Sequence, residues 1–140
     1  MSRFRLPALL VLLVVSAVLG LTACSTRATP SGSYSGLATS KAALDTFFTS
    51  ASRQDYSTTY SCYNDRYRQT VSQSDFIRHR EQASVLLNYR IDSMSVNGNS
   101  AVASATLTFG PSKGSATKVR SIAVREDLVS QAGTWRIRVW

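Results

Sequence analysis

Residues 89–109 read YRIDSMSVNGNSAVASATLTF, and this stretch decides the fold. Two runs rich in β-branched and aromatic residues, Tyr89–Val96 and Ala101–Phe109, flank Asn97-Gly98-Asn99. The second run alternates apolar and polar residues, which is typical of a strand buried on one face. Asn-Gly between two such runs is a strong hairpin signal, because both central residues of the expected turn must accept a positive φ. The stretch therefore predicts two paired antiparallel strands.

Two further strands are predicted after this hairpin. Turn-forming residues separate them from the hairpin and from each other, and Trp135, Ile137 and Val139 alternate with polar residues in the last one. The predicted strands are 118–129 and 135–140, and the turns are 110–114 and 131–133. Four such runs predict an antiparallel sheet with one face covered by helices.

The chain before the hairpin has helical periodicity. Asp55 is expected to cap a helix that begins at Tyr56, and Ser72 with Asp75 resembles a capping box for another helix over about 74–85. Apolar or aromatic residues recur at helical spacing along the first two predicted helices: Leu44, Phe47, Phe48 and Ala51, then Tyr56, Tyr60, Tyr63, Tyr67 and Val71. Helices followed by strands predict an α+β domain with a curved antiparallel sheet of about four strands.

The N-terminus predicts secretion. Arg3 and Arg5 precede an apolar run from Leu6 to Gly20, which ends in small residues. This order is typical of a secretory signal peptide, whereas a retained membrane-spanning helix needs about 20 apolar residues. We therefore expect residues 1–23 to be removed.

The segment that follows this run resembles the lipobox of bacterial lipoproteins. Its residues are Leu21, Thr22, Ala23 and Cys24. The resemblance implies that the Cys24 thiol carries a diacylglyceryl group, with palmitate-type chains, and that cleavage occurs just before it. Two acyl chains give stable membrane attachment. We therefore expect a lipid-anchored protein on the extracytoplasmic face of the cell membrane.

Composition divides the rest of the chain into two parts. Residues 24–40 are rich in Ser, Thr, Gly and Pro, so they are expected to form a flexible linker after the lipidated cysteine. Residues 41–140 have the length of a single domain.

The domain contains four short motifs that bear on its family: Phe47-Phe48, Asp55-Tyr56, Tyr67-Arg68 and the closing Gly133-Thr134-Trp135-Arg136-Ile137. On these motifs it resembles the nuclear-transport-factor-2-like (NTF2-like) fold, also called the cystatin-like cone. The resemblance implies that Trp135 and Ile137 enter the core. The first three of these motifs are similar to the helical half of small extracytoplasmic members without an assigned activity, and many such domains occur in actinobacterial lipoproteins.

Few residues are candidates for a catalytic or ligand-binding role. Asp75 and His79 lie four residues apart and would share a helix face as an acid–base pair, but Arg78 and Arg80 favour a solvated surface. Tyr56, Tyr60, Tyr63 and Trp135 are candidates to line a pocket, although packing of the tyrosine rings against the sheet is favoured.

The sequence contains no motif for a metal or a phosphate-bearing cofactor. No cluster of His, Cys and carboxylates has metal-ligand spacing, and no glycine-rich phosphate loop is present, so no metal or cofactor is expected. If Cys24 is lipidated, the second cysteine, Cys62, is expected to be buried rather than to form an intermolecular disulfide.

The chain carries a formal net charge of +8, with its basic residues dispersed. Outside the cytoplasm this charge favours anionic lipids or acidic wall polymers over nucleic acid as a partner. The sequence thus predicts a non-catalytic module that binds another envelope protein or an amphiphilic small molecule, and homodimerisation is compatible with the fold. The alternative is an isomerase- or cyclase-type enzyme with an Asp/His/Tyr pocket in the cone.

Overall fold

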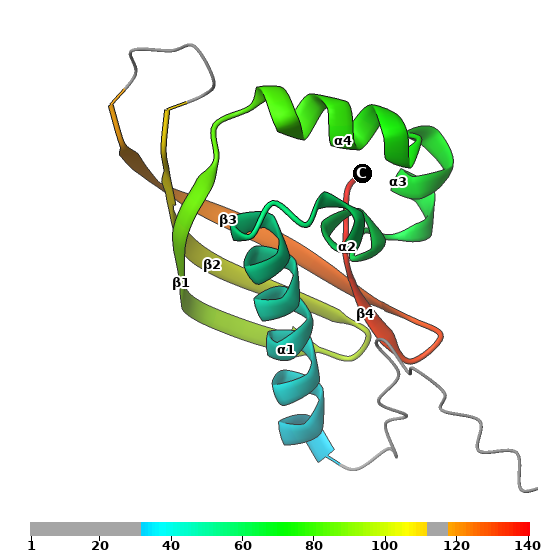
Figure 1. The fold of residues 1–140 in the computed structure, drawn as a ribbon. Coiled ribbons are helices and arrows are strands. Elements are labelled where there is room, and N and C mark those ends of the chain that lie inside the picture. Colours follow the sequence, from blue (N-terminus) through cyan, green and yellow to red (C-terminus); the bar gives the residue numbers. More distant parts are fainter. Residues whose placement is uncertain (1–31, 112–117) are drawn as a thin grey trace, which may run out of the picture.

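The computed structural model describes residues 32–111 and 118–140. Within these residues, four helices are followed by four strands, as the sequence predicts (Figure 1). The elements are α1 (Gly32–Ser52), α2 (Tyr56–Ser61), α3 (Asp65–Thr70), α4 (Gln73–Gln82), β1 (Leu86–Asn97), β2 (Ser100–Phe109), β3 (Arg120–Gln131) and β4 (Thr134–Ile137). The α+β class with helices packed on an antiparallel sheet is therefore confirmed.

The strands form one antiparallel meander in the order β1-β2-β3-β4. The β1–β2 hairpin pairs Asn97 with Ser100, so its central residues are Gly98 and Asn99. Of these two only Gly98 has a positive φ, of 56°. The expectation that both central residues adopt positive φ was wrong, because Gly at the first central position alone satisfies the type II′ geometry. The β3–β4 turn has positive φ at both Ala132 and Gly133.

The core lies between α1 and the concave face of the sheet. Leu44 and Phe48 of α1 are 0% and 1% exposed. Opposite them β2 presents Ala101, Ala103 and Ala105, whose short side chains leave room for the bulky helix residues. Irregularities in the β1–β2 register bend β1 and add curvature to the sheet. Figure 1 shows α1 lying over one face of the sheet, with the three shorter helices beyond its C-terminal end.

The first helix begins earlier than composition predicted. The linker was expected to extend to Ser40, but α1 already starts at Gly32. Contacts with distant strands account for the difference: Ser40 is fully buried and its hydroxyl lies 3.7 Å from the Met94 sulfur. Thr39 Oγ1 accepts a hydrogen bond of 3.1 Å from Trp135 Nε1. Tertiary packing of this kind overrides weak local helix propensity.

The single helix expected to carry the whole tyrosine row is divided in two. β4 causes the division by forming a parallel bridge between Ile137 and Tyr63. Ile137 N donates to Cys62 O and Ile137 O accepts from Asn64 N, both at 2.8 Å. These bonds take the main chain out of helical conformation, and Asn64 then caps α3. The expected caps Asp55 of α2 and Ser72 of α4 are confirmed.

Candidate functional site

A pocket of about 470 Å³ lies between α1, the end of α2 and β4, and we call it the α1–β4 pocket. Most of its wall consists of small or apolar side chains, with Trp135 as the largest. The lining residues come from three segments: Ala38, Thr39, Ala42, Ala43 and Thr46; Ser61 and Cys62; and Gly133–Arg136. Its volume is within the range of small-molecule sites.

The two faces of helix α1 differ in burial. The face with Leu44, Phe47 and Phe48 is buried against the sheet, whereas Ala38 and Ala42 are exposed. Because residues four apart share a helix face, these two alanines lie one above the other along the pocket wall. Short side chains at both positions keep this part of the wall open.

Arg136 contributes the charged group of the α1–β4 pocket. Its Nη1 donates a hydrogen bond of 2.5 Å to Ser61 O, at the C-terminal end of α2. A cation is favourable there, because the carbonyls at the end of a helix carry partial negative charge. No ion pair in the described part of the chain includes Arg136, and the pocket lining contains no Asp or Glu.

Of the four residues that the sequence offered as pocket lining, Trp135 lines this pocket. Tyr56, Tyr60 and Tyr63 are not part of its wall. The Tyr60 hydroxyl donates to Val71 O at 2.7 Å and lies 3.1 Å from Arg68 O, which satisfies it locally. Tyr56 is 8% exposed.

Tyr63 belongs to an aromatic cluster under α4. Its ring centroid lies 5.3 Å from that of Phe47 and 5.5 Å from that of Phe76, both in edge-on geometry. Burial raises the pKa of the Tyr63 hydroxyl well above its ordinary value, so the hydroxyl keeps its proton. The ring contacts are those of core packing.

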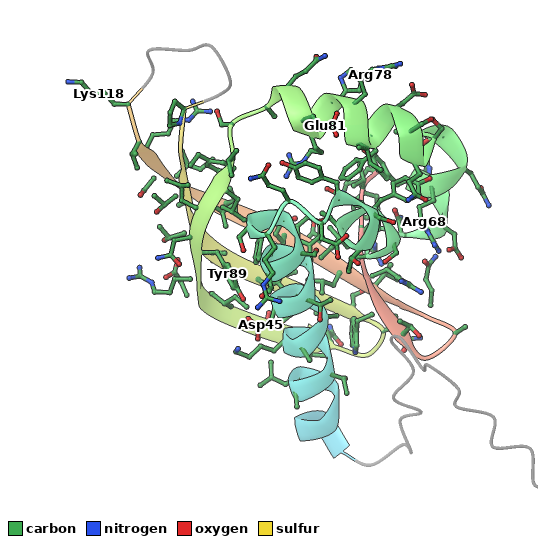
Figure 2. All side chains as sticks on the ribbon, in the orientation of Figure 1. Asp45, Arg68, Arg78, Glu81, Tyr89 and Lys118 are labelled. Atoms are coloured by element: carbon green, nitrogen blue, oxygen red, sulfur yellow. The ribbon has the colours of Figure 1, made fainter. Side chains whose placement is uncertain are left out.

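Asp75 and His79 lie on the surface of α4. The Asp75 carboxylate accepts a hydrogen bond of 2.7 Å from the Ser72 hydroxyl and an ion-pair contact of 2.5 Å from Arg78, and His79 is exposed. The Ser72 hydrogen bond, followed by the Arg78 charge, lowers the pKa of Asp75. A carboxylate stabilised in this way is a poor base, and it holds the hydroxyl of Ser72, the residue that caps α4. Figure 2 shows Arg78 on the outer side of α4.

Glu126 is an inward-facing acid that the sequence analysis did not single out. It pairs with the fully buried Ala103 in the β2–β3 register, so its side chain starts from the concave face of the sheet. Burial, followed by the charge of Asp127, raises the pKa of this carboxyl, while Arg80 lowers it. No hydrogen bond or ion pair within the described residues reaches the Glu126 carboxylate. Such a group can exchange a proton nearer neutral pH than an exposed glutamate.

A second pocket, of about 340 Å³, lies on the other side of α1, and both of its carboxylates are already engaged. Asp45 forms an ion pair of 2.7 Å with Lys41, and the Asp55 carboxylate accepts a hydrogen bond from Thr58 N. The Tyr89 hydroxyl, at 3.4 Å from Asp45 Oδ1, closes the gap between β1 and α1 (Figure 2). The acidic groups of this second pocket thus serve local structure, so we take the α1–β4 pocket as the candidate site.

Metals and membrane spans are not found in the described part of the chain. No group of three or more His, Cys, Asp or Glu residues among the described residues could hold a metal ion. No helix within residues 32–111 and 118–140 is long and apolar enough to cross a membrane. The lipobox prediction, with Leu21, Thr22, Ala23 and Cys24, lies outside the described residues.

The sequence analysis missed the helical part of the candidate site for an identifiable reason. It assigned Ala38 and Thr39 to a linker, and it counted Arg136 among dispersed surface charges. The available signal was the small-residue spacing of Ala38, Ala42 and Thr46, which fits one side of a helix.

Comparison with solved structures supports the fold described above. A ketosteroid isomerase-like protein from Erwinia carotovora atroseptica is 19% identical, with a TM-score of 0.55, and the match covers 72% of this chain and 89% of that one. A protein of the NTF2-like family from Streptomyces avermitilis is 12% identical, with a TM-score of 0.56, over 74% and 91% of the two chains. A SEC-C motif containing protein from Rhodopseudomonas palustris reaches a TM-score of 0.61 at 16% identity, over 73% and 77%.

These likenesses define a fold class. The chain has the NTF2-like fold, with helices packed on a curved four-stranded antiparallel sheet. No family model matches the chain, and no curated protein matches it. Sequence identities below 20% support the assignment of the fold alone. The function has to be inferred from the residues of the site itself.

Proposed function

We propose that this protein is a lipid-anchored module of the bacterial cell envelope that binds a hydrophobic or amphiphilic small molecule without transforming it. The observation that carries the binding role is the α1–β4 pocket, with its apolar wall of α1 alanines and Trp135. Anchoring is supported by the lipobox resemblance at Cys24. The NTF2-like fold is compatible with this role, because the same fold hosts unrelated functions.

Ligand binding is tested by a titration with decanol, followed through the methyl signals of labelled alanines in the full chain held in zwitterionic nanodiscs. We expect Ala38, Ala42 and Ala43 to shift, because their methyl groups line the pocket. Ala42→Phe should weaken binding about tenfold by filling the pocket, which corresponds to about 1.4 kcal/mol. Leu37→Phe is the matched control, since Leu37 lies on the same helix outside the lining. Binding that is equal in the two variants would contradict the proposal.

Anchoring is tested by the distribution of the chain between membrane and soluble fractions. We expect Cys24→Ser to move most of the protein out of the lipid-modified, membrane-bound fraction, because serine cannot accept the thioether-linked lipid. Cys62→Ser is the control, as the other cysteine of the chain, and should leave the distribution unchanged. Mass spectrometry of the mature N-terminus should show a diacylglyceryl cysteine in the parent. An unmodified Cys24 would refute the anchor.

An isomerase- or cyclase-type enzyme is the second candidate function. It is favoured by Glu126, an inward-facing acid with a raised pKa, and not by Asp75 or His79. The Erwinia protein described as ketosteroid isomerase-like shares the fold. Turnover of a ketosteroid that Glu126→Gln abolishes and Glu81→Gln preserves would favour this candidate over a binding module.

A further inference from the structure

The wall of the α1–β4 pocket combines an apolar surface with one cation. Ala38, Ala42 and Trp135 provide the apolar part, and Arg136 provides the cation. The volume of about 470 Å³ lies in the lower half of the range for small-molecule sites, which favours one alkyl chain over two.

No carboxylate of the site offsets the charge of Arg136, and only the partial negative charge at the end of α2 does so in part. Arg136 is half-buried, and its recorded hydrogen bond uses Nη1 and Ser61 O. A guanidinium has five N–H donors, so this bond leaves donors for another acceptor. No ion pair among residues 32–111 and 118–140 includes it. An anion beside this half-buried cation would add a charge-assisted hydrogen bond that the Ser61 carbonyl alone does not supply.

From this combination we infer that the pocket takes a single-chain amphiphile with an anionic headgroup, a carboxylate or a phosphate. The alkyl chain lies against the α1 alanines and the indole of Trp135, and the headgroup accepts hydrogen bonds from Arg136. A cationic amphiphile is repelled by the same residue, and a neutral one forgoes the charge-assisted bond. This inference rests on the proposed function, since it specifies the ligand of the same pocket.

The test compares three probes of equal chain length: decanoate, decanol and decyltrimethylammonium. The full chain is held in zwitterionic nanodiscs, and the methyl signals of Ala38 and Ala43 report occupancy of the pocket. Affinities are expressed against the free probe concentration, which corrects for partitioning into lipid. We expect the parent to bind decanoate at least about tenfold more tightly than decanol, and the cation more weakly than either.

Arg136→Gln should remove the preference for decanoate over decanol, so that the ratio of the two affinities falls about tenfold. Arg136→Lys should retain most of the preference, because it keeps the positive charge. Arg138→Gln is the matched control: Arg138 lies two residues further on, over the Trp140 ring at 4.8 Å and outside the lining. Decanol binding by each variant confirms that its pocket is folded.

The outcomes separate the two claims. Decanoate binding that survives Arg136→Gln, with decanol still bound, overturns the anionic headgroup and leaves the binding module intact. Equal binding of all three probes to the parent likewise overturns the anionic headgroup and leaves the binding module intact. Failure of every probe to shift the alanine methyls overturns both the ligand assignment and the proposed function.

Discussion

Leu44→Ala should lower the free energy of unfolding by about 3–5 kcal/mol, which is a large part of the stability of a small domain. Leu44 is 0% exposed and belongs to the cluster that joins α1 to the sheet. Removing its isobutyl group withdraws buried apolar surface and leaves a cavity that its neighbours fill only in part. Urea unfolding, followed by far-ultraviolet circular dichroism, gives the free energy and its dependence on denaturant.

Leu37→Ala is the matched control for this prediction. The residue is of the same type, lies seven positions earlier on the same helix, and is 38% exposed. Its replacement should change the unfolding free energy by no more than about 0.5 kcal/mol. Comparable losses in the two variants would mean that the buried face of α1 is wrongly assigned.

Phe76→Ala should lower the unfolding free energy by about 3 kcal/mol and release α4 before the rest of the domain. Phe76 is the buried residue of α4 and is 4% exposed. Its ring centroid lies 5.6 Å from that of Tyr60 and 5.5 Å from that of Tyr63. Native-state hydrogen exchange should show loss of protection in α4 while the amides of β2 stay protected.

Ile77→Ala tests whether the effect belongs to Phe76 itself. Ile77 is the neighbouring apolar residue of α4 and is half-buried, so its truncation should cost clearly less than that of Phe76. If the two substitutions released α4 equally, the aromatic cluster would not be what holds this helix in place.

Local sequence signals predicted the elements whose stability is local. Asp55 and Ser72 cap helices because their side chains reach main-chain N–H groups three residues on, at 3.1 Å in both cases. The alternation in β2 predicted its buried face, and Ala101, Ala103 and Ala105 are indeed at most 2% exposed. Neighbouring residues are sufficient to determine features of this kind.

Features that depend on distant contacts could not be predicted in this way. Thr39 and Ser40 of α1 contact Trp135 and Met94, and nothing in a Ser- and Gly-rich segment indicates such partners. The break between α2 and α3 depends on the bridge to Ile137. The α1–β4 pocket combines residues from both ends of the domain, so its existence is a property of the fold and not of any motif.

The hydrogen bond between Thr39 and Trp135 joins residues that are 96 positions apart. The ribosome synthesises α1 first and β4 last. The apolar face of α1 therefore lacks part of its packing partners while the intervening strands are still being synthesised. The domain therefore completes its core only when its final strand arrives.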